Sequence, residues 1–115
     1  MLSRKYKGLF AEYYAALFLS LKGYRILRMR FRTKYGETDI VACKKNVVIF
    51  VEVKYVRNRN FLYKAIFTSN FYRLSRNAMC FMHKHKHNNM TMSFDIIYVY
   101  DKIKIRHLKN VYLQT

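Results

Sequence analysis

With 115 residues the chain has the length of one domain, and its hydrophobic content of 52% excludes an intrinsically disordered segment. Lysine and arginine number 23 against 6 acidic residues, for a formal net charge of +17. So basic a body favours a polyanionic partner, most commonly nucleic acid. A Lys-, Asn- and Tyr-rich proteome would produce the same bias without a partner, and an anionic membrane surface is the third alternative. We expect a single domain over residues 1–115.

The first predicted element is a helix over residues 8–22, which contains no helix breaker and ends at Gly23. Basic residues precede its apolar run, but Glu12 interrupts that run and the run is too short to span a bilayer. We therefore predict an internal helix and no membrane partner. The two thiols, Cys43 and Cys80, belong to no metal-binding or redox motif, so a reducing, cytoplasmic location is expected.

Three strands are predicted next, over residues 24–32, 37–43 and 47–55. Their evidence is a run of β-branched and aromatic residues in each, with loose alternation and basic residues on one side of the first. The second and third strands are separated only by residues 44–46, which indicates a hairpin.

The second half of the chain begins with a basic loop at residues 56–61 and continues with a predicted helix over 62–82. Two short strands, 93–100 and 103–108, close the chain with a turn at residues 101–102. The order αβββαββ predicts an α/β fold in which a mixed β-sheet is flanked by helices. Helical spacing predicts one inward-facing stripe on the second helix, made of Ile66, Asn70, Leu74, Ala78 and Phe81.

Acidic residues are scarce, so their positions are informative. Three of them, Glu37, Asp39 and Glu52, fall on the two strands of the predicted hairpin. Because side chains alternate along a strand, Glu37 and Asp39 share one face, as do Glu52 and Lys54. If residues 45–46 form a two-residue loop, Asp39 lies opposite Glu52 and Glu37 lies opposite Lys54.

Opposed carboxylates repel each other, and a cation between them would remove the repulsion. Oxygen ligands without nearby cysteine favour Mg²⁺ or Mn²⁺ over zinc. Glu12 lies on an apolar helix face and needs a partner, so we expect it to approach Asp39 and Glu52. A divalent ion with Lys54 beside it suits phosphodiester hydrolysis. The alternative is that these acids only offset neighbouring cations on a solvated sheet face.

Several segments resemble one protein family. The runs GETDIVA at 36–42 and VVIFVEVK at 47–54 resemble the D…ExK core of the PD-(D/E)XK nuclease superfamily. The start GLFAEYYA resembles the GxxGExxA helix of the YraN-like family, small bacterial proteins regarded as endonucleases and related to archaeal Holliday-junction resolvases. SFDIIYV resembles the RFDVV strand of that family, and IRHLKNVY resembles its closing I-x-H-I-x-N-A-F segment.

The resemblance implies a restriction-endonuclease-like three-layer core and a Mg²⁺-dependent endonuclease that cuts DNA, including branched or structured DNA. It implies Glu12, Asp39 and Glu52 as the acids of the metal site and Lys54 as the catalytic lysine. Glu37 is a secondary candidate. Junction-cutting relatives suggest a homodimer by analogy.

The chain departs from the family pattern at positions near the expected site. The family's Asn after the first strand is Arg30, and its Lys at the start of the second helix is Asn70. These changes leave open a nucleic-acid-binding module that kept the fold and lost turnover. Most aromatic residues are expected in the interior, although their rings could stack on unpaired bases. The residues expected to contact nucleic acid are Arg30, Arg32, Lys34, Arg57, Arg59, Asn70 and Arg73.

Overall fold

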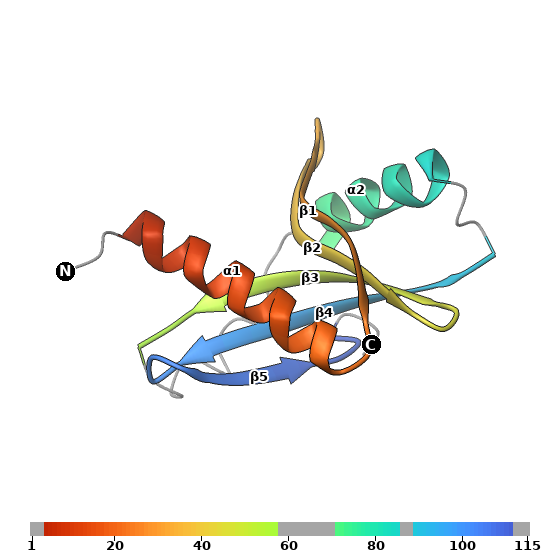
Figure 1. Ribbon diagram of the computed structural model, residues 1–115. Coiled ribbons are helices and arrows are strands. Elements are labelled where there is room, and N and C mark those ends of the chain that lie inside the picture. Colours follow the sequence, from red (N-terminus) through yellow and green to blue (C-terminus); the bar gives the residue numbers. More distant parts are fainter. Residues whose placement is uncertain (1–3, 58–70, 86–88, 112–115) are drawn as a thin grey trace.

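The computed structural model describes residues 4–57, 71–85 and 89–111 (Figure 1). The order of its elements is the predicted αβββαββ. The predicted helix over 62–82 is described only from residue 71 onward, so Ile66 and Asn70 lie outside the described residues. The elements are α1 (Arg4–Leu21), β1 (Arg25–Thr33), β2 (Gly36–Lys44), β3 (Val47–Tyr55), α2 (Phe71–Lys84), β4 (Thr91–Tyr100) and β5 (Lys104–Leu108).

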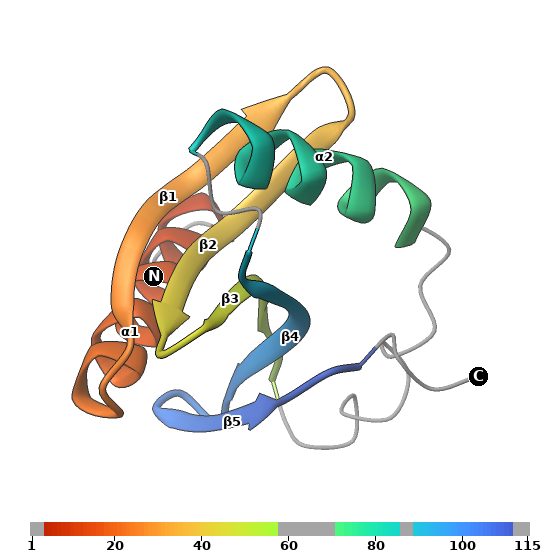
Figure 2. The same cartoon turned by 90° about the vertical axis from the view of Figure 1, so that its right-hand side faces the viewer.

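The strands form one five-stranded sheet in the order β1-β2-β3-β4-β5. β1 is antiparallel to β2 and β2 is antiparallel to β3, whereas β4 is parallel to β3 and β5 is antiparallel to β4. Helices α1 and α2 lie on opposite sides of this sheet (Figure 2). The predicted mixed α/β fold is therefore confirmed. Among the described helices, none has the length and hydropathy needed to cross a bilayer.

Each helix packs an apolar surface on the sheet, and that surface contains a buried alanine. On α1, Ala15 and Leu19 are fully buried against a cluster that includes Ile40 and Val51. On α2, Ala78 and Phe81 pack on the other face of the sheet. The short side chains of Ala15 and Ala78 let each helix backbone approach the sheet closely, so both faces of the sheet are covered by apolar layers.

The turn between β2 and β3 fixes the register that the sequence predicted. Lys44 pairs with Val47, and the ladder continues to the pair Ile40–Val51. It ends there, so the predicted oppositions of Asp39 with Glu52 and of Glu37 with Lys54 are wrong. The physical reason is a bend: beyond this point the β1–β2 hairpin turns away from the plane of β3 and β4 (Figure 1).

The backbone shows where the bend occurs. Arg30 has a φ of 53°, in the left-handed region that a non-glycine residue rarely adopts. Across the hairpin, Thr38 bonds to Asn77 of α2, whereas Ile40 packs on the α1 side. Residues two apart share a face in a regular strand, so the alternation of β2 is broken at Asp39.

Asn77 ties the bent hairpin to α2. It is fully buried. Its amide nitrogen donates to Thr38 Oγ1 at 2.7 Å and to the Phe31 carbonyl at 3.3 Å, and its oxygen accepts from Thr33 Oγ1 at 2.6 Å. A buried amide satisfied by three bonds fixes the relative position of the two elements.

Candidate functional site

Asp39 lies at the point where β2 separates from β3. The backbone N–H of Val53 donates to Asp39 Oδ2 at 2.8 Å, so the side chain takes the place of a ladder bond. Burial raises the pKa of Asp39 to about 6, although the Val53 bond acts in the opposite direction. A carboxyl group with a pKa this high has a titration close to physiological pH, as many functional acids do.

Three other carboxylates contribute to this shift. After burial, the negative charges of Glu12, Glu52 and Glu37 each raise the pKa of Asp39. The structure therefore brings α1, β2 and β3 together around one acidic group, as the sequence predicted for Glu12, Asp39 and Glu52. Three like charges near a half-buried carboxylate leave a local excess of negative charge that a cation would relieve.

All three of these acids have cationic partners, and Glu37 has the longest contact, 3.4 Å from its Oε2 to Arg32 Nη2. Arg30 Nε lies 2.8 Å from Glu12 Oε1, and Lys54 Nζ lies 2.7 Å from Glu52 Oε2. Burial lowers the pKa of Lys54, but the hydrogen bond and charge of Glu52 outweigh it, so that the net shift is upward. Lys54 is therefore a charged lysine beside the acidic group, bonded to Glu52.

The donors suit a hard divalent cation, since all of them are carboxylate oxygens. Across residues 4–57, 71–85 and 89–111, however, no three His, Cys, Asp or Glu side chains are arranged to hold a metal ion together. An ion at Asp39 would therefore need the Glu12 or Glu52 carboxylate to exchange its cationic partner. The acids fit the ion in chemistry and charge, and the side chains would have to turn toward it.

A small hollow, partly open to solvent, adjoins Asp39, and its enclosed space is about that of one water molecule. Its lining combines acidic and apolar side chains. The lining residues are Glu37, Thr38, Asp39, Phe50, Val51, Glu52, Leu74, Phe94 and Asp95.

The predicted nucleic-acid contacts fall into two groups. Arg30 and Arg32 are exposed on β1, where Arg32 Nη2 lies 3.4 Å from Glu37 Oε2. Lys34, Arg57 and Arg73 are also exposed. Arg59 and Asn70 lie outside the described residues. Of these exposed cations, Arg30 and Arg32 contact acids of the group, Glu12 and Glu37 respectively.

A family model described as "Uncharacterised protein family UPF0102" matches residues 11–99. The chain belongs to UPF0102. A UPF0102 protein of Caldicellulosiruptor saccharolyticus is 36% identical over 105 residues, covering 90% of this chain and 89% of that protein. Another, from Nitrobacter winogradskyi, is 38% identical over 102 residues, covering 88% and 86%. This membership confirms the predicted YraN-like family.

A UPF0102 protein of Rhizobium etli shares a shorter and more similar stretch. It is 62% identical over 48 residues, which are 42% of this chain and 39% of that protein. The match to such relatives thus spans about two-fifths of their length.

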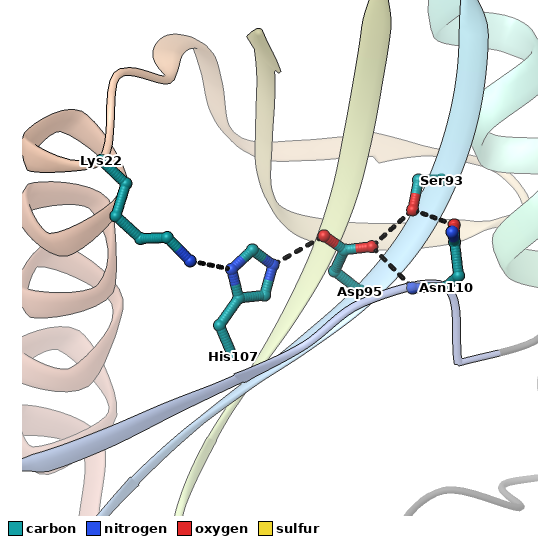
Figure 3. Close-up of polar contacts among 5 residues, drawn as sticks. All are labelled: Lys22, Ser93, Asp95, His107 and Asn110. Carbon is teal, nitrogen blue, oxygen red and sulfur yellow. Dashed lines mark hydrogen bonds and ion pairs between the residues drawn. The ribbon is translucent and has the colours of Figure 1, made fainter.

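This UPF0102 chain has a second polar cluster that our sequence analysis did not identify (Figure 3). Asp95 on β4 accepts from the Ser93 hydroxyl at 2.6 Å and the Asn110 N–H at 3.1 Å, and lies 2.6 Å from His107 Nε2. Lys22 Nζ, at the end of α1, lies 3.0 Å from His107 Nδ1. Ser93 Oγ also contacts Asn110 Oδ1. The cluster ties α1, β4 and β5 together.

The signal for this cluster was present in the segments that resemble the UPF0102 family. SFDIIYV contains Ser93 and Asp95, and IRHLKNVY contains His107 and Asn110. Their meeting depends on the pairing of β4 with β5, in which Ile97 lies opposite His107. The two family-like segments therefore indicated these residues, and the pairing of β4 with β5 brings them into contact.

Proposed function

We propose that this UPF0102 chain is a Mg²⁺-dependent endonuclease, with Mn²⁺ as a substitute, that hydrolyses phosphodiester bonds of DNA, including branched or structured DNA. The observation that carries the proposal is that Glu37, Asp39 and Glu52 line one hollow, where burial and nearby carboxylates raise the pKa of Asp39 to about 6. Lys54 lies beside this group through its bond to Glu52. A cytoplasmic location and a homodimer are part of the same proposal, and free Cys43 and Cys80 accord with a reducing compartment.

The residues divide the work as follows. Asp39 and Glu52 would hold the divalent ion, with Glu12 as the third acid. When bound, the ion supplies a Lewis acid that polarises the phosphate and lowers the pKa of a water. Lys54 contributes a fixed positive charge that stabilises the developing charge on the phosphate oxygens. Glu37, exposed and paired with Arg32, is a secondary acid at the rim.

A second candidate function is nucleic-acid binding without turnover. The observation that favours it is the Arg30–Glu12 ion pair, which supplies a protein cation where an acid of the metal site is expected. This candidate predicts binding that weakens steeply with salt, because cations of the protein replace counterions on the phosphates. It predicts no Mg²⁺-dependent product.

The test of the first function is cleavage of linear, single-stranded, flap and four-way-junction DNA with and without Mg²⁺. We expect Mg²⁺-dependent cutting that falls roughly 100-fold or more in Asp39→Ala and in Lys54→Ala. Asp101→Asn serves as the control, because Asp101 lies in the turn between β4 and β5. Cutting that survives in both site variants would reject the assignment, whereas salt-dependent binding with no product from the wild type would favour the binding module.

A further inference from the structure

Two tyrosines and an arginine form a stack on the surface of the α2 side. The Arg76 guanidinium lies over the Tyr35 ring at 4.8 Å and over the Tyr72 ring at 5.6 Å, measured to the centroids. Arg76 Nη2 donates to the Tyr35 hydroxyl at 3.1 Å, and Nη1 donates to the Tyr72 hydroxyl at 3.3 Å. We call these three residues the Tyr–Arg stack.

The stack bridges two elements that border the hollow at Asp39. Tyr35 lies in the β1–β2 turn, two residues before Glu37, and Tyr72 lies on α2, two residues before Leu74. Glu37 and Leu74 both line the hollow. The stack therefore joins the hairpin and α2, the two elements that also supply Glu37 and Leu74 to the hollow.

The Tyr–Arg stack is held in position before any ligand binds. Asn77, one residue after Arg76, is fully buried and bonds to Thr33 and Thr38 of the hairpin. The two halves of the stack thus belong to elements that are already fixed to each other. A prearranged surface loses less conformational entropy on binding than one that must be ordered.

The chemistry of the stack fits a nucleotide. Tyr72 is 68% exposed, so its ring offers an open aromatic face. A guanidinium has five N–H donors, and the bonds to the two tyrosines leave others for a phosphate. Around it, α2 contains no acidic residue, Arg73 is adjacent, and Lys34 Nζ lies 5.3 Å from the Tyr35 ring centroid. Aromatic faces beside cations are the usual platform for single strands.

We propose that the Tyr–Arg stack binds an unpaired nucleotide, with the base stacked on Tyr72 and its phosphate bound by Arg76. This site deepens the proposed function, on which it rests for the identity of the polymer, and it assigns a single-stranded segment of the substrate as the part recognised beside α2. A membrane surface supplies phosphates but no planar base to stack on the Tyr72 ring, so a nucleotide fits both parts of the stack.

The test is binding of short fluorescein-labelled single-stranded DNA, single-stranded RNA and duplex DNA by anisotropy, in EDTA so that no cleavage contributes. We expect Tyr72→Ala to weaken single-strand binding roughly 5-fold or more, and Tyr72→Phe to retain most of it. The duplex affinity should change less, since paired bases offer no free face. The two single-stranded arms distinguish DNA from RNA as the source of the nucleotide.

The control is Ile103→Ala, which removes a side chain of similar exposure, 66%, from the β4–β5 turn. A melting curve for each variant verifies the fold, since Tyr72 is exposed and its removal leaves the core intact. Equal single-strand affinity in Tyr72→Ala and wild type would overturn the site, as would an equal loss in Ile103→Ala. Because binding is measured without metal, the site can fail while cleavage persists, and cleavage can fail while the site holds.

Discussion

Asp39 on β2 and Asp95 on β4 are both removed from solvent in the same sheet, yet their surroundings differ. Asp95 receives the Ser93 hydroxyl and the Asn110 N–H and lies 2.6 Å from His107 Nε2. The side chains of Asp95 and His107 are 1% and 2% exposed. Each of these three groups either donates a hydrogen bond to Asp95 or, in the case of the His107 ring nitrogen, can do so when it carries a proton.

Among the described residues, Asp39 accepts one hydrogen bond, from the Val53 N–H, and three nearby carboxylates raise its pKa. The result is a pKa near 6 for Asp39, raised first by burial and then by Glu12, Glu52 and Glu37. The difference teaches how to separate two kinds of polar cluster. A satisfied carboxylate supports the fold, whereas a carboxylate among like charges carries a stability cost that function can explain.

The largest expected effect comes from breaking the satisfied cluster. Asp95→Ala would leave His107 buried without its carboxylate partner and would remove one of the two acceptors of Ser93, and we expect a loss of about 3–5 kcal/mol in the free energy of unfolding. Urea denaturation at neutral pH measures it. The matched control is Asp101→Asn, which alters an exposed pair with Lys104 at 3.7 Å and should change stability by about 0.5 kcal/mol or less. Near-equal values for the two variants would contradict a structural role for Asp95.

At Asp39 we expect a substitution to raise the free energy of unfolding, not to lower it. Asn at this position keeps an acceptor for the Val53 N–H and removes the charge, so Asp39→Asn should stabilise the fold by about 1–3 kcal/mol at neutral pH. The folded pKa of about 6 exceeds 3.8, the ordinary pKa of an aspartate side chain. Ionising Asp39 therefore destabilises the wild type, and the cost grows as pH rises from about 4 to about 6.

The measurement is urea unfolding of both proteins at intervals between pH 4 and pH 8. The stability difference should be near zero at the acid end and reach its maximum above the folded pKa. A difference that stays constant across this range would remove the electrostatic explanation. Loss of cleavage together with gained stability would be the signature of an acid retained for chemistry.

The smallest effect is expected at Arg30. The Arg30 guanidinium pairs with Glu12, so it competes with a metal ion for one of the acids near Asp39. Arg30→Asn removes the partner of Glu12 and places at a φ of 53° a residue that tolerates this region better. We expect Mn²⁺ or Mg²⁺ to bind severalfold more tightly, read by calorimetry. Arg32→Asn, which loses only the longer contact to Glu37, is the control. Unchanged metal affinity in Arg30→Asn would show that this ion pair does not compete with the metal.

Much of the fold could be predicted from local patterns. The two-residue loop after Lys44 fixed the β2–β3 register correctly down to the pair Ile40–Val51, because turn length and alternation determine pairing near a hairpin. The apolar stripe of α2 was correct where it can be compared, since Ala78 and Phe81 are buried. These features depend on residues that are close in sequence.

The bend at Arg30 and Asp39 could not be predicted in this way, because it depends on Asn77, which lies 38 positions after Asp39 and anchors the hairpin to α2. The charges of Glu12, Glu52 and Lys54 all act on or with Asp39, while the contact that places Asp39 is a bond to the Val53 backbone. Long-range packing decided this geometry, whereas the role of the four residues as a site stays a prediction.

The strand order leaves β1 and β5 as the outer strands of the sheet, and outer strands present backbone groups to which another chain can add. Exposed cations line both of them: Arg25, Arg28, Arg30 and Arg32 on β1, and Lys104 and Arg106 on β5. A second copy that approaches edge to edge presents the same positive charges, and their repulsion discourages polymerisation through the sheet edges. Phosphates that neutralise this row would remove the protection, so a polyanion-coated molecule should aggregate more readily than a bare one.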